Sequence, residues 1–467
     1  MNLEGYGPIA TAMGGASMAH DNATAAVMNN PSTLGLMSQT NRIDLALGML
    51  GPDVSAEVTM GSNTMNANSS ADAFYMPAFG WAQKGGKLTY GFAVFAQGGM
   101  GTEFDANSWM ADPSGGNNSA LTSGLVNRSE VGVGRAILPL VYELDKNVFI
   151  GGSIDFVWAG MDLQMAMSEA QFQDLANPQA QTIGTASGSM VQGFGQMYAP
   201  FGGAGINTLH HAYFDFSNDS DFTGEAFGTG VAGKMGITMR LTPKVTIGAT
   251  YHTKTRLSDL KTDNATMQMA INGDAGMIMT PTDTSDDGTV SDMALNVTGK
   301  LTIKDFEWPA TLGFGAAVQA TDKLLLVADF KRIAWADVME QFSMSFEADN
   351  SQANGPFANA KMDMALFQHW TDQTVIAVGG AYKATDELTL RLGYNHASNP
   401  IPAAYLNPLF PAIVESHVTS GIGYETGASA INLSVTKALE VDVTNPGSNV
   451  KSTHSQTSWQ LMYSHLF

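Results

Sequence analysis

The chain has 467 residues, a formal net charge of −21 and no cysteine. The acidic balance argues against a nucleic-acid partner, because phosphate binding needs clustered lysine and arginine. The lack of cysteine excludes a disulfide framework and a thiolate metal site. No apolar run approaches the ~20 residues that a membrane-spanning helix needs. The composition therefore fits a soluble globule or a membrane β-barrel, but not a helical membrane protein.

The first 40 residues are rich in glycine, alanine, methionine and asparagine, and they carry almost no charge and no strand alternation. They lack the basic start and apolar core of a signal peptide. We therefore expect either a cytosolic protein or a numbering that begins near the mature N-terminus, and the strands that follow favour the second. We predict that residues 1–40 form a hatch, or plug, inside a barrel built from residues 41–467.

From about Ile43 onward, apolar residues recur at every second position, which predicts β-strands with one apolar face. The opposite face is small and polar rather than charged, which is typical of a barrel with lipid outside and a crowded polar lumen. Aromatic residues near the strand ends fit interfacial girdles. The clearest alternating segments are 43–49, 88–94, 148–158, 235–241, 245–251, 388–394 and 431–436.

Short connections alternate with long ones along the chain, as in outer-membrane barrels, which have short periplasmic turns, long outer loops and an even strand number. Six short turns and seven long loops predict an all-β fold, a 14-stranded antiparallel transmembrane β-barrel. We expect Pro309 to mark a bulge within one strand. The expected short turns lie near 85–86, 145–146, 242–244, 321–322, 384–385 and 426–427; the long loops span 51–72, 98–124, 161–225, 263–291, 346–362, 397–415 and 444–452.

The C-terminal strand ends in Phe467 and resembles the assembly signal of bacterial outer-membrane barrels. Three longer stretches are similar to the FadL/TodX family of outer-membrane transporters for hydrophobic compounds. The first is the opening segment, which includes residues 19–25 and Asn30-Pro31; Ser32 replaces the alanine of the family's Asn-Pro-Ala signature. The second is the region 302–313 together with 334–337. The third is the C-terminal block, which includes 390–395 and 399–402. The resemblance implies a hatch-plugged barrel of fourteen strands, and passive movement of fatty acids or other apolar molecules that leave sideways into the membrane.

Two of the expected outer loops, 98–124 and 161–225, are unusually apolar. Exposed apolar loops are costly unless they bind something, and the family resemblance implies that these two form a ligand-capture groove. The alternative is that they pack only on each other. The candidate groove residues are Phe104, Trp109, Met110, Met190, Phe194, Met197, Tyr198 and Phe201.

The third expected strand ends at Gly98, Gly99 and Gly101. Glycine within a strand often marks a bulge or a place where another part of the backbone or a ligand comes close. In the resembled family a kink in this strand opens the barrel wall, so these glycines are the candidate lateral gate. An ordinary glycine-rich turn is the alternative.

A fatty-acid ligand would need a cation near its buried carboxylate. Arg135 is one candidate, because it follows Val131 and Val133 and precedes Ile137, so one strand register would place a lone cation in an apolar lumen wall. Arg240 and Arg391 are others. The alternative is that each lumen cation pairs with an aspartate such as Asp155 or with the hatch. Some family members carry a basic residue near the end of the fifth strand, but here that place reads Trp158-Ala159-Gly160-Met161, which leaves uncharged or hydroxylated ligands open.

We expect no catalytic activity, metal or cofactor, because no triad and no recurring metal spacing is present. The expected function is passive transport of long-chain fatty acids or related hydrophobic molecules across the bacterial outer membrane, by a monomer in contact with outer-membrane lipid and lipopolysaccharide. Aromatic hydrocarbons, export of oxidised fatty acids, and a structural adhesin or receptor barrel are the alternatives. We expect residues 1–8 to move, with Leu3 and Tyr6 filling the lumen pocket when no ligand is bound.

Overall fold

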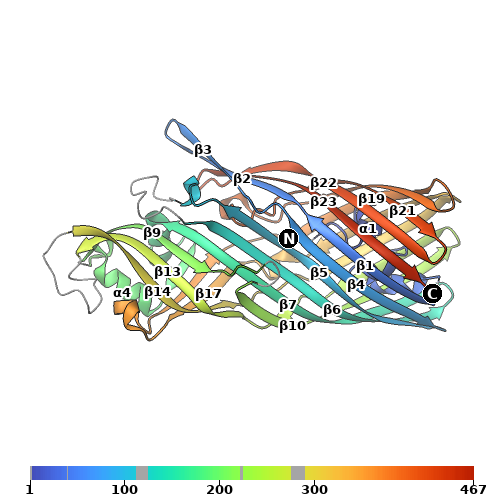
Figure 1. Cartoon of the computed structure of the whole chain (residues 1–467), viewed down its shortest axis with the longest axis horizontal. Coiled ribbons are helices and arrows are strands. Elements are labelled where there is room, and N and C mark those ends of the chain that lie inside the picture. The colour runs from blue at the N-terminus through green and yellow to red at the C-terminus, as the bar shows by residue number, and fades with distance from the viewer. Residues whose placement is uncertain (1–2, 39, 112–124, 204, 221–223, 275–289) are drawn as a thin grey trace.

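The computed structural model describes residues 3–38, 40–111, 125–203, 205–220, 224–274 and 290–467. These residues form an elongated barrel with the C-terminus at one end (Figure 1). None of the described helices is long and apolar enough to cross a membrane.

A closed antiparallel ring of strands forms the barrel wall. The ring closes because β1 pairs with β23, so that Leu45 lies opposite Tyr463. This arrangement confirms the predicted antiparallel barrel. In order, the ring consists of β1 (Asn41–Leu50), β4 (Phe74–Gly85), β5 (Leu88–Phe104), β6 (Asn127–Asp145), β7 (Val148–Ser168), β10 (Ala226–Thr242), β11 (Val245–His252), β15 (Thr311–Thr321), β16 (Leu324–Ile333), β19 (Gln373–Lys383), β20 (Leu388–Ala397), β21 (Ser416–Thr426), β22 (Ser429–Thr444) and β23 (Val450–Leu466).

The expected outer loops are more regular than the sequence indicated. In the described residues the sheet holds 23 strands, nine more than the fourteen of the ring, because segments taken as loops pair with one another and so satisfy their backbone hydrogen bonds. The added strands are β2 (Pro52–Met60), β3 (Asn63–Asn68), β8 (Gly184–Ser187), β9 (Ile206–Phe216), β12 (Arg256–Leu257), β13 (Leu260–Asp274), β14 (Val290–Lys304), β17 (Gln341–Ala348) and β18 (Lys361–Phe367).

Short helices complete the outer part of the molecule. Two are α-helices, and α3 begins with a capping box at Ser168. They are α3 (Glu169–Ala176), α4 (Ser189–Met197), η3 (Trp109–Ala111), η4 (Ala199–Phe201), η5 (Trp335–Asp337), η6 (Gln352–Phe357) and η7 (Ala403–Tyr405).

The position expected for Pro309 was wrong. This residue lies in the irregular segment 305–310, between β14 and β15, rather than inside a strand. Proline cannot donate to a β-ladder, and the neighbouring Trp308 instead exchanges hydrogen bonds with Thr255 (Trp308 N to Thr255 Oγ1, 2.6 Å).

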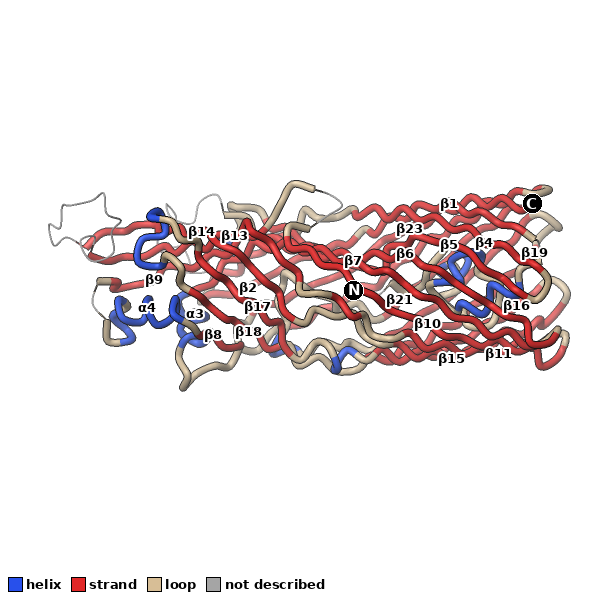
Figure 2. The backbone as a smooth tube through the Cα atoms, turned by 90° about the horizontal axis from the view of Figure 1, so that it is seen from below, coloured by secondary structure: helices blue, strands red, loops and turns tan. Residues whose placement is uncertain are grey.

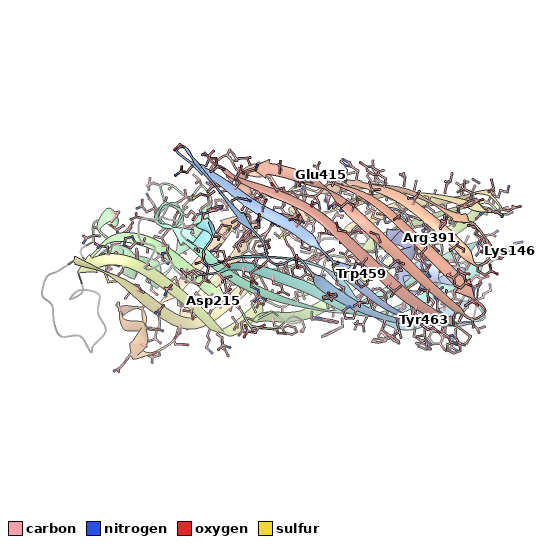
Figure 3. The ribbon with its side chains drawn as sticks, turned by 45° about the horizontal axis from the view of Figure 1, so that its top comes forward. Lys146, Asp215, Arg391, Glu415, Trp459 and Tyr463 are labelled. Carbon is pink, nitrogen blue, oxygen red and sulfur yellow. The ribbon has the colours of Figure 1, made fainter. Side chains whose placement is uncertain are left out.

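The ring turns its apolar side chains outward and its polar ones inward. Leu45 is 54% exposed and Ile154 is 72% exposed, whereas Asp44 and Asp155 on the opposite strand faces are buried. This is the reverse of a soluble globule and suits a wall surrounded by lipid. Lys146 lies in a tight turn at the end of the barrel near Tyr463, and Asp215 lies toward the opposite end (Figure 3).

The opening segment lies inside the ring, in the half that contains the tight turns (Figure 2). It contains α1 (Pro8–Thr11), η1 (Ala23–Val27) and η2 (Pro31–Leu36). Wall carboxylates hold its backbone: Asp44 accepts from Thr24 N at 2.8 Å, and Asp329 accepts from Ser17 N at 2.6 Å. The predicted internal hatch is therefore present.

Asn30 and Pro31 fix the last part of the hatch. Asn30 caps η2 by accepting from Ser32 N, and its Nδ2 donates to Met18 O at 2.8 Å. Pro31 occupies the first helical position, where its fixed φ angle suits a helix start. The Asn30 side chain lies directly against Gly236 of β10, where an added Cβ would overlap it.

A matched pair of glycine substitutions on β10 should test this fit. We expect Gly236→Ala to destabilise the folded protein by about 1–3 kcal/mol, because the new methyl group overlaps the buried Asn30 amide. The measurement is the urea midpoint in detergent, together with protease cleavage of the hatch. Gly233→Ala is the control, since its nearest contact would be 3.4 Å away; equal effects of the two substitutions would contradict the fit.

Candidate functional site

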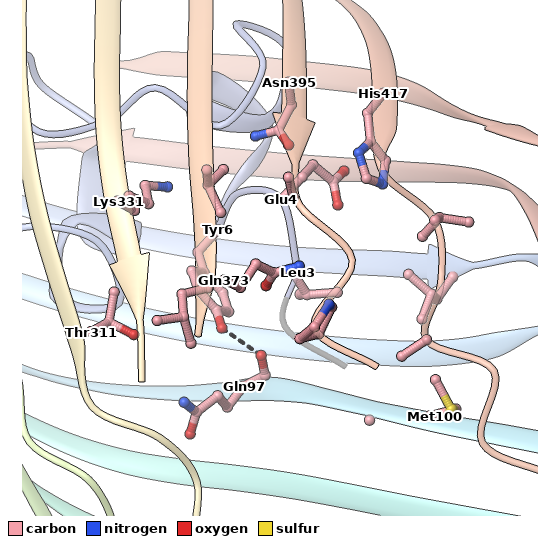
Figure 4. Close-up of a pocket in the computed structure, with 18 of the residues that line it drawn as sticks. Leu3, Glu4, Tyr6, Gln97, Met100, Thr311, Lys331, Gln373, Asn395 and His417 are labelled. Carbon is pink, nitrogen blue, oxygen red and sulfur yellow. Dashed lines mark hydrogen bonds between the residues drawn. The ribbon is translucent and has the colours of Figure 1, made fainter. Parts of the chain in front are cut away.

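A cavity lies between the start of the hatch and the outer halves of the wall strands. It contains about 1460 Å³ of non-atom space, part of it open to solvent. Figure 4 shows Leu3, Glu4 and Tyr6 of the hatch facing strands from several sides of the barrel. Its apolar lining includes Met18, Met28, Leu50, Phe74, Met100, Ile333, Trp335, Trp370 and Val375.

A tryptophan cluster forms one wall of this cavity. Trp335 packs edge-on against Trp370, with ring centroids 5.1 Å apart, and against Trp308 at 5.6 Å. Trp335 and Trp370 both line the cavity. Aromatic faces and flexible methionines give an apolar surface that can adapt to varied ligands.

The hatch start is bonded to the wall next to the cavity. Tyr6 Oη donates to the backbone carbonyl of Gln97 at 2.5 Å (Figure 4). Asn29 Nδ2 donates to Tyr6 O at 2.9 Å, and the Glu4 carboxylate accepts from Thr436 Oγ1 at 2.8 Å. Leu3 and Tyr6 thus line the cavity, while Met1 and Asn2 lie outside the described residues.

The predicted gate glycines lie where the barrel wall is interrupted. β4 pairs with β5 only from Phe79 opposite Val94 down to the tight turn, and β5 shows a register shift between Ala96 and Gly98. Toward the outer end, Ser69, which precedes β4 in the chain, forms an isolated β-bridge with Phe104 at the end of β5. Among the described residues, no backbone pairing joins Phe74–Ala78 of β4 to Phe95–Glu103 of β5, and we call this interval the wall window.

Cavities reach the wall window from inside. Gly99 and Gly101 line the main cavity, whereas Gly98 is not among its lining residues. A second cavity of about 370 Å³ lies between Leu3, Tyr6 and the wall residues Met76, Ala78, Phe95 and Ala96. The Phe74 ring lies over Gly101, where an added Cβ would come within 2.6 Å of it.

Arg135 is not the lone cation that its apolar neighbours suggested. Its Nε donates to Gln97 Oε1 at 2.5 Å, and its Nη1 contacts Asp155 at 2.8 Å. Lys234 also contacts Asp155. Val131 and Val133 are buried on the same strand, but neither they nor Arg135 line the cavity.

The other two predicted cations lie away from the cavity. Arg240 is exposed, donates to Lys146 O at 3.4 Å in a tight turn, and lies over the Phe149 ring. Arg391 is buried and donates to Asn432 Oδ1 at 3.0 Å. The structure therefore does not bring the predicted cations together around one carboxylate.

The predicted capture residues form packed clusters in the outer extension. Phe104 and Met110 are buried, and Trp109 donates from Nε1 to Ala56 O at 3.2 Å. A second group contains Met190 and Phe194 of α4 and Tyr198, which directly follows this helix; Met197 is partly buried beside it. Phe194 packs against Phe172 at 4.9 Å. These side chains pack on other protein groups, and nothing is described of the Phe201 side chain.

Two cavity residues, His417 and His454, were not singled out from the sequence. They lie on β21 and β23 and line the same cavity as Gln97 of β5 and Lys331 of β16. Only their register in the closed ring brings them to one cavity. The Trp335 position was part of the family resemblance, but its pairing with Trp370 was not foreseen.

The closed barrel, its internal hatch and the apolar cavity define a bacterial outer-membrane channel protein. The chain belongs to the family described as outer membrane protein transport protein (OMPP1/FadL/TodX), whose model matches residues 2–458. This places it among the outer-membrane transporters of hydrophobic compounds.

Solved structures agree with this assignment. The toluene transporter TodX of Pseudomonas putida is 28% identical, with a TM-score of 0.80 over 100% of this chain and 99% of that one. The toluene transporter TbuX of Ralstonia pickettii is 26% identical, with a TM-score of 0.74 over the same shares. A FadL homologue of Pseudomonas aeruginosa, 13% identical with a TM-score of 0.67, covers 100% and 99% and shares the fold.

One curated relative matches a short part of the chain. It is an uncharacterised protein from Chlorobium limicola, encoded in the 5′ region of a phosphoenolpyruvate carboxykinase gene, and it is 50% identical over 58 residues. The match covers 12% of this chain and 29% of that protein.

The buried charge cluster leads to a stability prediction. We expect Asp155→Asn to destabilise the protein by about 3–5 kcal/mol, because it leaves Arg135 and Lys234 buried without their shared carboxylate. The urea midpoint in detergent measures this. Asp363→Asn is the control: Asp363 pairs with Lys304 at 2.6 Å on the exposed surface, so its loss should change the stability by less than about 1 kcal/mol. Similar midpoints for the two variants would refute the role given to Asp155.

Proposed function

We propose that the protein is a passive channel for uncharged hydrophobic molecules, with monoaromatic hydrocarbons as the favoured class. A ligand reaches the cavity from the outer end and leaves through the wall window into the lipid. The interruption of β4–β5 pairing beside an apolar cavity is the observation that carries this proposal. The channel acts as a single chain among outer-membrane lipid and lipopolysaccharide, because one chain supplies both the cavity and the wall window, and we infer no catalytic step.

A sideways exit suits an apolar ligand. A wet axial pore would offer such a molecule no favourable surface, whereas the second cavity offers apolar side chains up to the wall. Leu3 and Tyr6 separate the two cavities, since both residues line each of them. Withdrawal of residues 3–6 would join the cavities into one route.

The charges around the cavity support an uncharged ligand over a fatty acid. Lys234 contacts the Asp155 carboxylate, which it shares with Arg135, and Lys331 donates to Gly15 O at 3.0 Å on the same strand face as Asp329. Glu4 adds a further carboxylate to the lining. A ligand carboxylate would be buried without a free cation, which is unfavourable. The names of TodX and TbuX as toluene transporters support the same choice.

Blocking the wall window should stop transport. The chain contains no cysteine, so Ala96→Cys provides a single thiol in the second cavity. After labelling with a bulky, reducible thiol reagent, we expect toluene uptake by transporter-deficient cells to fall to the background of cells without the protein, and reductant to restore it.

The control is Val378→Cys, because Val378 is exposed on the outer face of β19 away from the wall window. Its labelling should leave toluene uptake unchanged. Uptake by labelled Ala96→Cys at the control rate would rule out lateral exit. A parallel assay measures the uptake of isotopically labelled laurate, a fatty acid. Faster uptake of laurate than of toluene would contradict the proposal that the ligands are uncharged.

Removing the Tyr6 hydroxyl should loosen the hatch start. Tyr6→Phe deletes a hydrogen bond worth about 0.5–1.5 kcal/mol while keeping the ring, so we expect faster toluene uptake and faster amide exchange at residues 3–7. Tyr213→Phe is the control, because Tyr213 Oη donates to Val126 O at 2.6 Å in the outer extension. Unchanged exchange of the backbone amides at residues 3–7 would contradict the role given to the Tyr6 hydrogen bond.

A further inference from the structure

The cavity lining contains ring nitrogens that are buried and have no hydrogen-bond partner among the described residues. They are Trp370 Nε1, His417 Nδ1 and His454 Nε2. All three side chains are more than nine-tenths buried, and all three line the cavity. Leaving a buried polar group unsatisfied costs about 1–3 kcal/mol, so three such groups around one cavity point to a bound polar atom.

The hydrogen bond of His454 defines what its free nitrogen can do. Nδ1 lies 2.7 Å from the carbonyl oxygen of Pro411. A carbonyl can only accept, so Nδ1 carries the hydrogen. In the neutral ring Nε2 is therefore a bare acceptor. It needs a donor from whatever occupies the cavity.

His417 lies on the same patch of the wall. It is opposite Ala438 of β22, which in turn is opposite Gln456 of β23, two residues from His454. In the described part of the chain its imidazole makes no hydrogen bond, so the neutral ring offers one donor and one acceptor. Glu4 and His417 point toward one another at the edge of the cavity (Figure 4).

Trp370 contributes a different group. Its indole Nε1–H can only donate. The lining therefore offers a donor at Trp370, an acceptor at His454 and one group of each kind at His417, around an otherwise apolar space.

We propose that the two histidines form a subsite for the hydroxyl group of an uncharged apolar ligand, a phenol or an alcohol. A hydroxyl both donates and accepts, so it can satisfy His454 Nε2 and accept from His417. A carboxylate cannot donate to His454 Nε2 and is repelled by Glu4. Among the described residues, no group of three side chains could hold a metal ion there. This subsite rests on the proposed function and names a more specific ligand class for the same cavity.

The test compares p-cresol with toluene, which differ by one hydroxyl group. Equilibrium dialysis of the labelled compounds against the whole protein in detergent, corrected for empty micelles, gives each Kd. We expect the wild-type protein to bind p-cresol at least roughly fivefold more tightly than toluene, as one net hydrogen bond allows. We expect His454→Phe and His417→Phe to abolish this preference while toluene binding is retained.

Two further variants keep the result interpretable. His454→Gln returns an acceptor near the position of Nε2 and should restore part of the preference. His396→Phe, on the exposed face of β20, should keep the full preference. Equal wild-type binding of the two compounds, or an undiminished preference in His454→Phe, would overturn the hydroxyl subsite. Failure of the wild-type protein to bind either compound would overturn the proposed function as well.

Discussion

The close contact between the hatch backbone and a belt of wall glycines determines the rest of the structure. Three glycine pairs face each other across neighbouring strands: Gly151 with Gly236, Gly248 with Gly315, and Gly379 with Gly393. At each pair an added Cβ would meet hatch atoms. Because these positions lack side chains, the hatch backbone can reach the wall, where Asp44 and Asp329 accept its N–H groups. The hatch thereby occupies the inner half of the lumen, and the two cavities described above lie beside its first residues.

Gln97 connects three features around these cavities. Its backbone carbonyl holds Tyr6, its side chain holds Arg135, and it is the extra residue at the register shift of β5. Asp155 lies opposite Ile137 on one side and opposite Ala232 on the other, so Arg135 and Lys234 reach it diagonally from both neighbouring strands. The wall window, the Tyr6 hydrogen bond and the buried charge cluster therefore all involve Gln97. A β-bulge can redirect one residue, so that its carbonyl reaches Tyr6 while its side chain reaches Arg135.

The sequence predicted the parts of the fold that depend on local patterns. The alternation of apolar residues predicted strands with one apolar face, and the short turns predicted which strands are neighbours. The sequence named Asp155 among the possible partners of the lumen cations but could not assign this aspartate to Arg135, because the contact depends on the register between β6 and β7. The same holds for His417 and His454, whose neighbours are set by two further strand registers. The outer strands were missed because segments such as Ile206–Phe216 alternate weakly, and their pairing partners are distant in sequence.

The small number of bonds on the hatch start has a consequence for the energy source of transport. Side-chain hydrogen bonds at residues 4–6 join Tyr6 to Gln97, Asn29 to Tyr6, Thr436 to Glu4 and Thr11 to Gly5. At about 1 kcal/mol each, their release costs roughly 4 kcal/mol, which corresponds to an open population near 0.1%. Thermal fluctuation alone supplies such a state. Under the proposed function, heat alone would therefore open the route, and the concentration gradient of the ligand would set the direction of flow.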